Sequence, residues 1–167
     1  MELISKQKAD LMATSVKPIP DGYGAVTPLL VVRDAARAME FYKAVFGAKE
    51  RMRMTGPGGK IVHAELTIGN ALLMVTDEFP EWGNLGPKSA ADSPVRIALY
   101  VDDVDELVKR AVAAGATLLI PVADQFYGDR SGRLADPFGH LWIVSTHKED
   151  VSPGEMQRRM DELLGKN

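Results

Sequence analysis

The strongest constraint on the fold is a pattern of residues that occurs twice in the chain. Asp34 lies 13 positions before Gly47, and Asp102 lies 13 positions before Gly115. Each Asp ends an apolar run, and each Gly is followed by Ala. A recurrence at a spacing of about 68 residues indicates one supersecondary unit written twice. We therefore expect two similar units, packed side by side, that enclose a trough between them.

Apolar periodicity and helix-ending residues predict the same order of elements in each unit. In the first unit, Asp34 is a helix N-cap and Gly47 a helix stop, which gives a strand at 26–33, a helix at 35–46, and strands at 48–54, 60–68 and 71–76. In the second unit we expect a strand at 95–101, a helix at 103–114, a strand at 116–120, a long loop at 121–133, and strands at 133–135 and 140–146. The predicted organisation is an N-terminal arm (1–24), one domain (25–150) with repeats at 25–77 and 94–147, and a C-terminal helix within 152–167.

Composition narrows the classes of function. A chain of 167 residues is long enough for one domain with a proper core. A formal net charge of −3 argues against nucleic acid as a partner, because no basic surface is available to neutralise phosphates. The absence of cysteine removes disulfides, thiolate metal sites and a cysteine nucleophile. With no apolar run of 18 residues, we expect a cytoplasmic protein without a membrane partner.

Several short motifs carry a family resemblance. The first unit contains PLLVVRD (28–34), FY (41–42) and FGA (46–48), and the second contains ALYVD (98–102) and DPFGH (136–140). In this order and spacing they resemble the glyoxalase/bleomycin-resistance/extradiol-dioxygenase superfamily, also called vicinal oxygen chelate, and QFYGDRSG (125–132) resembles its PhnB-like branch. The resemblance implies an α+β fold in which two βαβββ units form an eight-stranded open barrel-like sheet. It also implies a homodimer.

Enzymes of that superfamily hold a divalent metal with four side chains from the inner sheet faces. Carried over to this chain, the four positions are Thr27, Met74, Arg96 and Ile143. Divalent ions of this kind prefer carboxylate or imidazole ligands, so no cofactor is predicted at the usual site. A metal held elsewhere, by His63 and Glu65, is the alternative.

Strand alternation gives a second view of the trough. Successive side chains of a strand point to opposite faces, so the polar residues of strands 60–68 and 95–101 should face away from the apolar core. Residues of the loop at 124–133 are expected to reach over the mouth. The candidate ligand-binding residues are His63, Glu65, Thr67, Arg96, Tyr100, Gln125, Tyr127 and Arg130.

Each of these candidates has a structural alternative. His63 and Glu65, about 7 Å apart on one strand face, are candidates to share a metal or a proton. The alternative is that Glu65 simply pairs with Arg96 or with a lysine of a neighbouring strand. Arg130 is an anion clamp, or the segment is a turn in which Asp129 pairs with Arg130 or Arg133.

Three functions fit the sequence. The leading hypothesis is a protein that binds a small organic molecule in the trough without the usual metal. The second is a metal-dependent lyase, isomerase or dioxygenase with a rearranged site that includes His63 and Glu65. The third is an oligomeric module with a vestigial cavity.

Overall fold

The computed structural model describes residues 16–165, and it contains two units of the same element order. The first 15 residues of the predicted N-terminal arm lie outside the described residues. The first unit consists of β1 (Leu29–Val32), α2 (Ala35–Phe46), β2 (Lys49–Thr55), β3 (Ile61–Ile68) and β4 (Ala71–Asp77). The second consists of β5 (Arg96–Tyr100), α3 (Val104–Ala113), β6 (Thr117–Asp124), β7 (Asp129–Ala135) and β8 (Leu141–His147). A final helix, α4, spans Pro153–Leu163.

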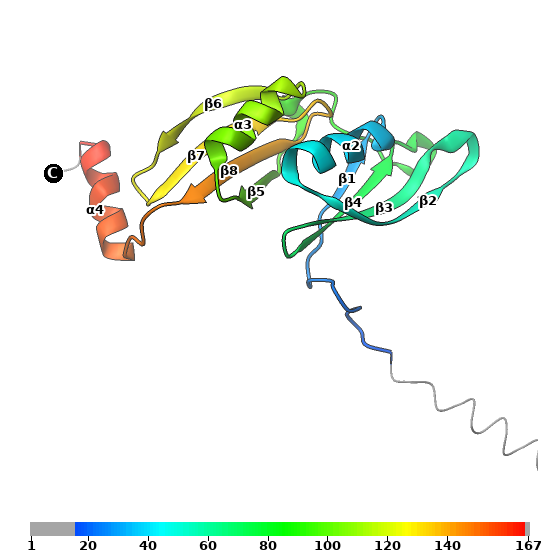
Figure 1. Ribbon diagram of the computed structural model, residues 1–167, viewed down its shortest axis with the longest axis horizontal. Coiled ribbons are helices and arrows are strands. Elements are labelled where there is room, and N and C mark those ends of the chain that lie inside the picture. The colour runs from blue at the N-terminus through cyan, green and yellow to red at the C-terminus, as the bar shows by residue number, and fades with distance from the viewer. Residues whose placement is uncertain (1–15, 166–167) are drawn as a thin grey trace, which may run out of the picture.

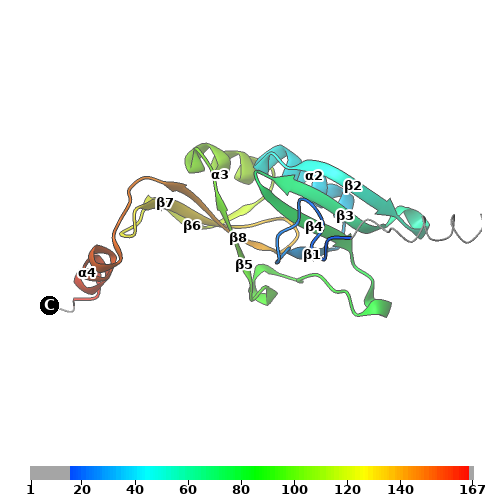
Figure 2. The same ribbon diagram turned by 90° about the horizontal axis from the view of Figure 1, so that it is seen from below.

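Each unit has its own four-stranded mixed sheet, with strand orders β1-β4-β3-β2 and β5-β8-β7-β6. In each sheet, the strand that comes first in the chain pairs in parallel with the strand that comes last, β1 with β4 and β5 with β8. The other neighbouring strands are antiparallel. The two units lie side by side, with α2 and α3 neighbours on the same side of the molecule (Figures 1 and 2). The predicted α+β fold of two βαβββ units is confirmed, and its eight strands form two sheets rather than a closed barrel.

Helix α2 begins and ends where its sequence dictates. The Asp34 carboxylate accepts a hydrogen bond from the backbone N–H of Arg37 at 3.0 Å, which satisfies one free donor of the first turn. Gly47 ends the helix in the left-handed conformation, with φ of 67°, which costs glycine little. Between these ends, one face of the helix is buried against the first sheet. The helix thus fixes which face of that sheet stays open.

A buried aromatic cluster joins the two units. Tyr42 and Phe46 of α2 contact Trp142 of β8, with ring centroids 5.6 Å and 4.4 Å from the indole. Tyr42 is fully buried and Trp142 is nearly so. The Tyr42 hydroxyl donates to the Asp136 carboxylate at 2.8 Å, across the boundary between the units. The core is therefore continuous from one unit to the other.

The predicted long loop at 121–133 is wrong. Strand β6 continues to Asp124 and β7 begins at Asp129, so only residues 125–128 form the turn. Gly128 adopts a φ of 96° at this turn. Residues 124–133 are mostly polar, yet 129–133 belong to β7, an inner strand that pairs with β6 on one side and β8 on the other. Polarity was therefore a poor guide to backbone conformation here.

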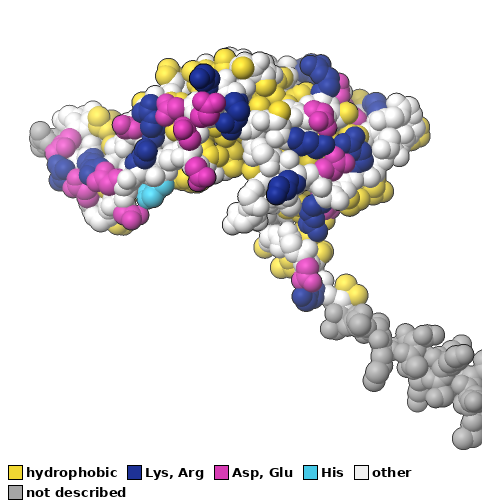
Figure 3. All heavy atoms as spheres, viewed as in Figure 1, with side chains coloured by type: hydrophobic (Ala, Val, Ile, Leu, Met, Phe, Trp, Pro, Cys, Tyr) yellow, Lys and Arg dark blue, Asp and Glu magenta, His cyan; other side chains and the backbone are white. Residues whose placement is uncertain are grey.

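Helix α4 lies at one end of the molecule, and charged side chains gather over it (Figures 1 and 3). None of its residues is buried. Arg159 holds it to the turn after β6: the guanidinium lies 2.8 Å from the Glu149 carboxylate and donates to the Phe126 carbonyl at 3.1 Å. Ion pairs of this exposed kind stabilise a fold little, so the helix is attached loosely.

Candidate functional site

The pairing registers place most of the candidate residues on the open faces of the two sheets. In the first sheet, Leu29 and Glu65 both pair with Met74, so the three side chains share a face. In the second sheet, Arg96, Ala98 and Tyr100 alternate with core residues along β5, and Tyr100 pairs with Ser145. The opposite faces carry the core beneath α2 and α3. This is the orientation that strand alternation predicts.

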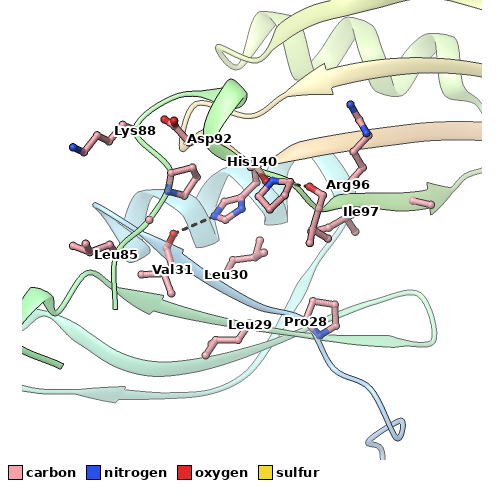
Figure 4. Close-up of a pocket in the computed structure, with 16 residues that line it drawn as sticks. Pro28, Leu29, Leu30, Val31, Leu85, Lys88, Asp92, Arg96, Ile97 and His140 are labelled. Carbon is pink, nitrogen blue, oxygen red and sulfur yellow. Dashed lines mark hydrogen bonds between the residues drawn. The ribbon is translucent and has the colours of Figure 1, made fainter. Parts of the chain in front are cut away.

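A cavity of about 870 Å³ lies between β1 and β5, at the boundary of the two units (Figure 4). Its walls come from three segments, 28–31, 85–88 and 92–98, and from His140. Leu29, Leu30, Val31, Leu85 and Ile97 make most of it apolar. Three charged side chains also line it: Lys88, Asp92 and Arg96. Apolar walls with a few polar groups are typical of small-molecule sites.

The linker between the units forms one wall of this cavity. Gly86 comes close to β1: a Cβ there would lie 2.5 Å from the Val31 carbonyl oxygen. The Arg33 guanidinium donates to the Pro87 carbonyl at 3.0 Å. His140 closes the cavity from the second unit, with Nε2 lying 3.1 Å from the Val31 carbonyl oxygen. On the side of the second unit, the linker approaches Gly139, where a Cβ would lie 3.0 Å from the Pro87 ring, so the wall is packed against both units.

Outside this cavity, a group of polar residues surrounds Glu65 on the open face of the first sheet. Glu65 is only 4% exposed. Its carboxylate accepts a hydrogen bond from the Tyr23 hydroxyl and lies 3.3 Å from His63 Nε2 and 3.6 Å from Arg51 Nη1. The cation that pairs with Glu65 is thus Arg51 of β2, and the predicted partner, Arg96 or a lysine, is wrong. The Tyr23 hydrogen bond in particular lowers the pKa of Glu65, and the pKa of Tyr23 is raised in return.

Another group of polar residues lies at the far end of the second sheet. It lines a cavity of about 550 Å³, to which Tyr127 also contributes. The buried Asp129 carboxylate accepts from the Tyr100 hydroxyl at 2.6 Å and lies 2.8 Å from His147 Nδ1. His147 Nε2 lies 3.0 Å from the Asp150 carboxylate. Hydrogen bonding to Asp129, and then to Asp150, raises the pKa of His147. Asp129 likewise raises the pKa of Tyr100.

Two candidates from the supposed loop take other positions. Arg130 lies in β7 on the side of α3, where its guanidinium donates to the Asp105 carboxylate at 2.6 and 2.8 Å. It also donates to Asp124 at 3.1 Å. Because both carboxylates engage its guanidinium, Arg130 is not placed as an anion clamp over the trough. The predicted pairing of Asp129 with Arg130 or Arg133 is also wrong, since Asp129 is held by Tyr100 and His147. The Gln125 amide donates to the nearby Ala123 carbonyl at 3.1 Å.

The eight candidate residues thus do not form a single site. Arg96 lines the cavity between the units. His63 and Glu65 lie together on the first sheet, with Thr67 two residues farther along β3. Tyr100 and Tyr127 line the cavity at the end of the second sheet. The sequence interpretation missed Tyr23, Asp129 and the linker wall. An ionisable residue such as Glu65 within an otherwise apolar strand was the available signal that a distant partner exists.

The superfamily's usual metal does not fit this chain. Of the four carried-over positions, Arg96 supplies no lone pair, Ile143 has no donor atom, and Met74 has only a soft thioether, which leaves the hydroxyl of Thr27. Within residues 16–165, no three histidine or carboxylate side chains are grouped to share an ion. At the alternative position, the Glu65 carboxylate is already engaged by Tyr23, His63 and Arg51.

Comparison with known proteins defines the class. The model of the Glyoxalase/Bleomycin resistance protein/Dioxygenase superfamily matches residues 24–144, and the chain belongs to this superfamily. An uncharacterized protein of Mycobacterium tuberculosis is 41% identical over 158 residues, covering 93% of this chain and 89% of that one.

Solved structures agree with this assignment. TioX from Micromonospora sp. ML1 is 29% identical, with a TM-score of 0.59 over 74% of this chain and 98% of TioX. The PhnB protein of Bacillus cereus, at 18% identity, shares the fold, with a TM-score of 0.57 over 74% of this chain and 99% of that one. None of the helices within residues 16–165 is long and apolar enough to cross a membrane.

Proposed function

We propose that this protein binds a small organic molecule in the cavity between its two units, without a metal at the superfamily's usual position. The observation that carries the proposal is the cavity itself. Its volume of about 870 Å³ lies in the range of roughly 300–1,000 Å³ that is typical of ligand sites. Its walls are contributed by both units and by the linker.

The lining favours an amphipathic ligand. Leu29, Val31, Leu85 and Ile97 provide apolar surface for the body of the molecule. Charged groups of both signs, with Arg96 among them, line the same cavity and are available to a polar end of the ligand. Because Lys88 and Arg96 outnumber Asp92, an anionic polar end is preferred over a cationic one.

The metalloenzyme hypothesis has weaker support. The four family positions lack hard ligands, and a metal at Glu65 would have to displace the Tyr23 hydroxyl and approach the Arg51 guanidinium. A cation beside that guanidinium is opposed by like-charge repulsion. The donor chemistry of this chain therefore favours binding without the usual metal.

We also propose that the protein acts as a homodimer, as the sequence resemblance implies. Large apolar side chains are exposed on the open sheet faces, among them Leu29, Met54 and Ile120. Exposed apolar surface of this kind is often covered by a partner chain. Sedimentation velocity over a range of protein concentrations tests it: a dimer supports this assembly, and a monomer at all concentrations contradicts it.

The binding proposal is tested with 8-anilinonaphthalene-1-sulfonate, a fluorescent molecule with apolar aromatic rings and one anionic sulfonate. The Ala98→Trp variant places an indole against the cavity from an exposed position of β5. The matched control is Ala123→Trp, an exposed position of β6 in the same sheet and outside the cavity lining. We expect saturable binding that Ala98→Trp weakens at least about tenfold and Ala123→Trp leaves unchanged. Equal effects of the two variants would contradict the proposal.

A further inference from the structure

The environment of Glu65 is unusual for a carboxylate. It lies on the open face of β3, where the register pairs it with Met52 on one side and Met74 on the other. Two thioether side chains flank it, and only 4% of the residue is exposed to solvent. A charged group in such surroundings requires hydrogen-bond donors. The sheet itself supplies two neighbours, His63 and Arg51.

The main donor comes from outside the sheet. The Tyr23 hydroxyl, which belongs to the segment before β1, donates to the Glu65 carboxylate. The Arg51 guanidinium lies 5.4 Å from the centre of the Tyr23 ring. A phenol is thereby recognised in two ways, by an acceptor at its hydroxyl and by a cation over its ring.

Few other contacts hold the segment that carries Tyr23. Between residues 16 and 28, every residue is exposed except Tyr23 and Thr27, which are half-buried. This segment leaves the first unit at the start of β1 (Figure 1). The ion pair of Lys17 with Asp21, at 2.7 Å, stays within the segment. At its end, the Pro28 carbonyl accepts a hydrogen bond from the Met74 N–H of β4 at 2.9 Å. Before Pro28, the Tyr23 side chain is the segment's principal attachment to the sheet.

We propose that Glu65, His63 and Arg51 form a second binding site, which recognises a hydroxyl-bearing aromatic ring, and that Tyr23 is its tethered occupant. The site takes phenols because it supplies a carboxylate for the hydroxyl, a guanidinium for the ring and flanking methionines for apolar contact. A short tether holds Tyr23 at an effective concentration on the order of millimolar, so a free phenol must reach a comparable concentration to replace it. The site is separate from the cavity between the units, and neither proposal depends on the other.

Chemical rescue tests this inference. Tyr23→Ala removes the phenol and leaves its site vacant, whereas Tyr23→Phe removes only the hydroxyl and keeps the ring in place. The probes are 4-methylphenol, which reproduces the tyrosine side chain, and toluene, which lacks the hydroxyl. The readout is the unfolding temperature of the full chain as a function of probe concentration.

We expect 4-methylphenol to stabilise Tyr23→Ala saturably, at concentrations about tenfold lower than toluene. Tyr23→Phe should not respond, because its ring fills the site. Adding Glu65→Gln to Tyr23→Ala should abolish the preference for 4-methylphenol over toluene. The inference is overturned by equal stabilisation from the two probes, by no saturable effect, or by an equal response of Tyr23→Phe.

A measurement on the unmodified chain does not depend on the folding of any variant. With ¹³C at the tyrosine Cζ, four signals are expected, since the chain contains four tyrosines. Excess 4-methylphenol should move the Tyr23 signal toward its free value, and toluene should not. A Tyr23 signal that stays in place at saturating 4-methylphenol also overturns the inference.

Discussion

The buried carboxylate of Asp136 offers a quantitative test of how the two units are joined. One oxygen accepts from the Tyr42 hydroxyl at 2.8 Å and the Trp142 indole at 3.0 Å. The other accepts from the backbone N–H groups of Phe138 and His140, both at 2.9 Å. In Asp136→Asn, an amide NH₂ replaces one oxygen, so two buried donors lose their acceptor. At about 1–3 kcal/mol for each unsatisfied donor, the free energy of unfolding should fall by about 2–6 kcal/mol.

Urea unfolding followed by circular dichroism measures this loss. Because Tyr42 and Asp136 belong to different units, we expect one cooperative transition for the parent and the variant, with an unchanged denaturant dependence. Tyr42→Phe should cost about 1–2 kcal/mol, since it removes one of four donors. The exposed control Asp102→Asn should cost less than about 0.5 kcal/mol. A loss below about 1 kcal/mol for Asp136→Asn, or two separate transitions in the parent protein, would refute this reasoning.

Three further predictions follow from individual sites. The raised pKa of His147 means that its protonated form stabilises the fold; this stabilisation is complete below pH about 6.5 and is lost as the pH rises through the folded-state pKa. In His147→Gln, the free energy of unfolding should therefore fall less steeply as the pH rises through that range. An unchanged pH dependence of unfolding would argue that His147 does not stabilise the fold in this way. Gly128→Ala should cost about 3 kcal/mol, because φ is 96° and a Cβ would lie 2.1 Å from the Glu149 carbonyl oxygen. Gly154→Ala, with open space around it, should be neutral or stabilising; urea unfolding of the two variants measures both effects. After EDTA treatment and reloading with Mn, Fe, Ni, Co or Zn, elemental analysis should find no stoichiometric ion; one ion per chain that His63→Ala removes would favour the metalloenzyme.

Much of the fold is encoded in local sequence. The predicted helix at 35–46 coincides with α2, because an N-cap aspartate and a C-terminal glycine act within one turn of the chain. Alternation along β3 correctly separated Ala64 and Leu66 from Glu65, since the inner side chains had to be apolar. Strand β6 was predicted too short because its exposed edge does not require the alternation that a half-buried strand requires.

The candidate sites were less predictable, because they depend on segments distant in sequence. No local pattern shows that Tyr23 reaches Glu65, 42 positions later. Nor does a linker rich in glycine and proline reveal that it forms a cavity wall against Val31. Arg130 was misassigned for the related reason that its partner Asp105 lies on another element, 25 positions earlier. Sheet faces follow from periodicity, whereas contacts across loops follow only from the assembled core.

The most direct test of metal-independent ligand binding is a thermal-shift screen of organic molecules on the metal-stripped protein, run in parallel on Ala98→Trp. Ligands that bind only the folded state raise the unfolding temperature by mass action. We predict that some compounds stabilise the metal-free parent protein and fail to stabilise Ala98→Trp, whose added indole occupies part of the cavity between the units. Stabilisation that requires an added divalent metal, or that is equal in the two proteins, would contradict the proposed function.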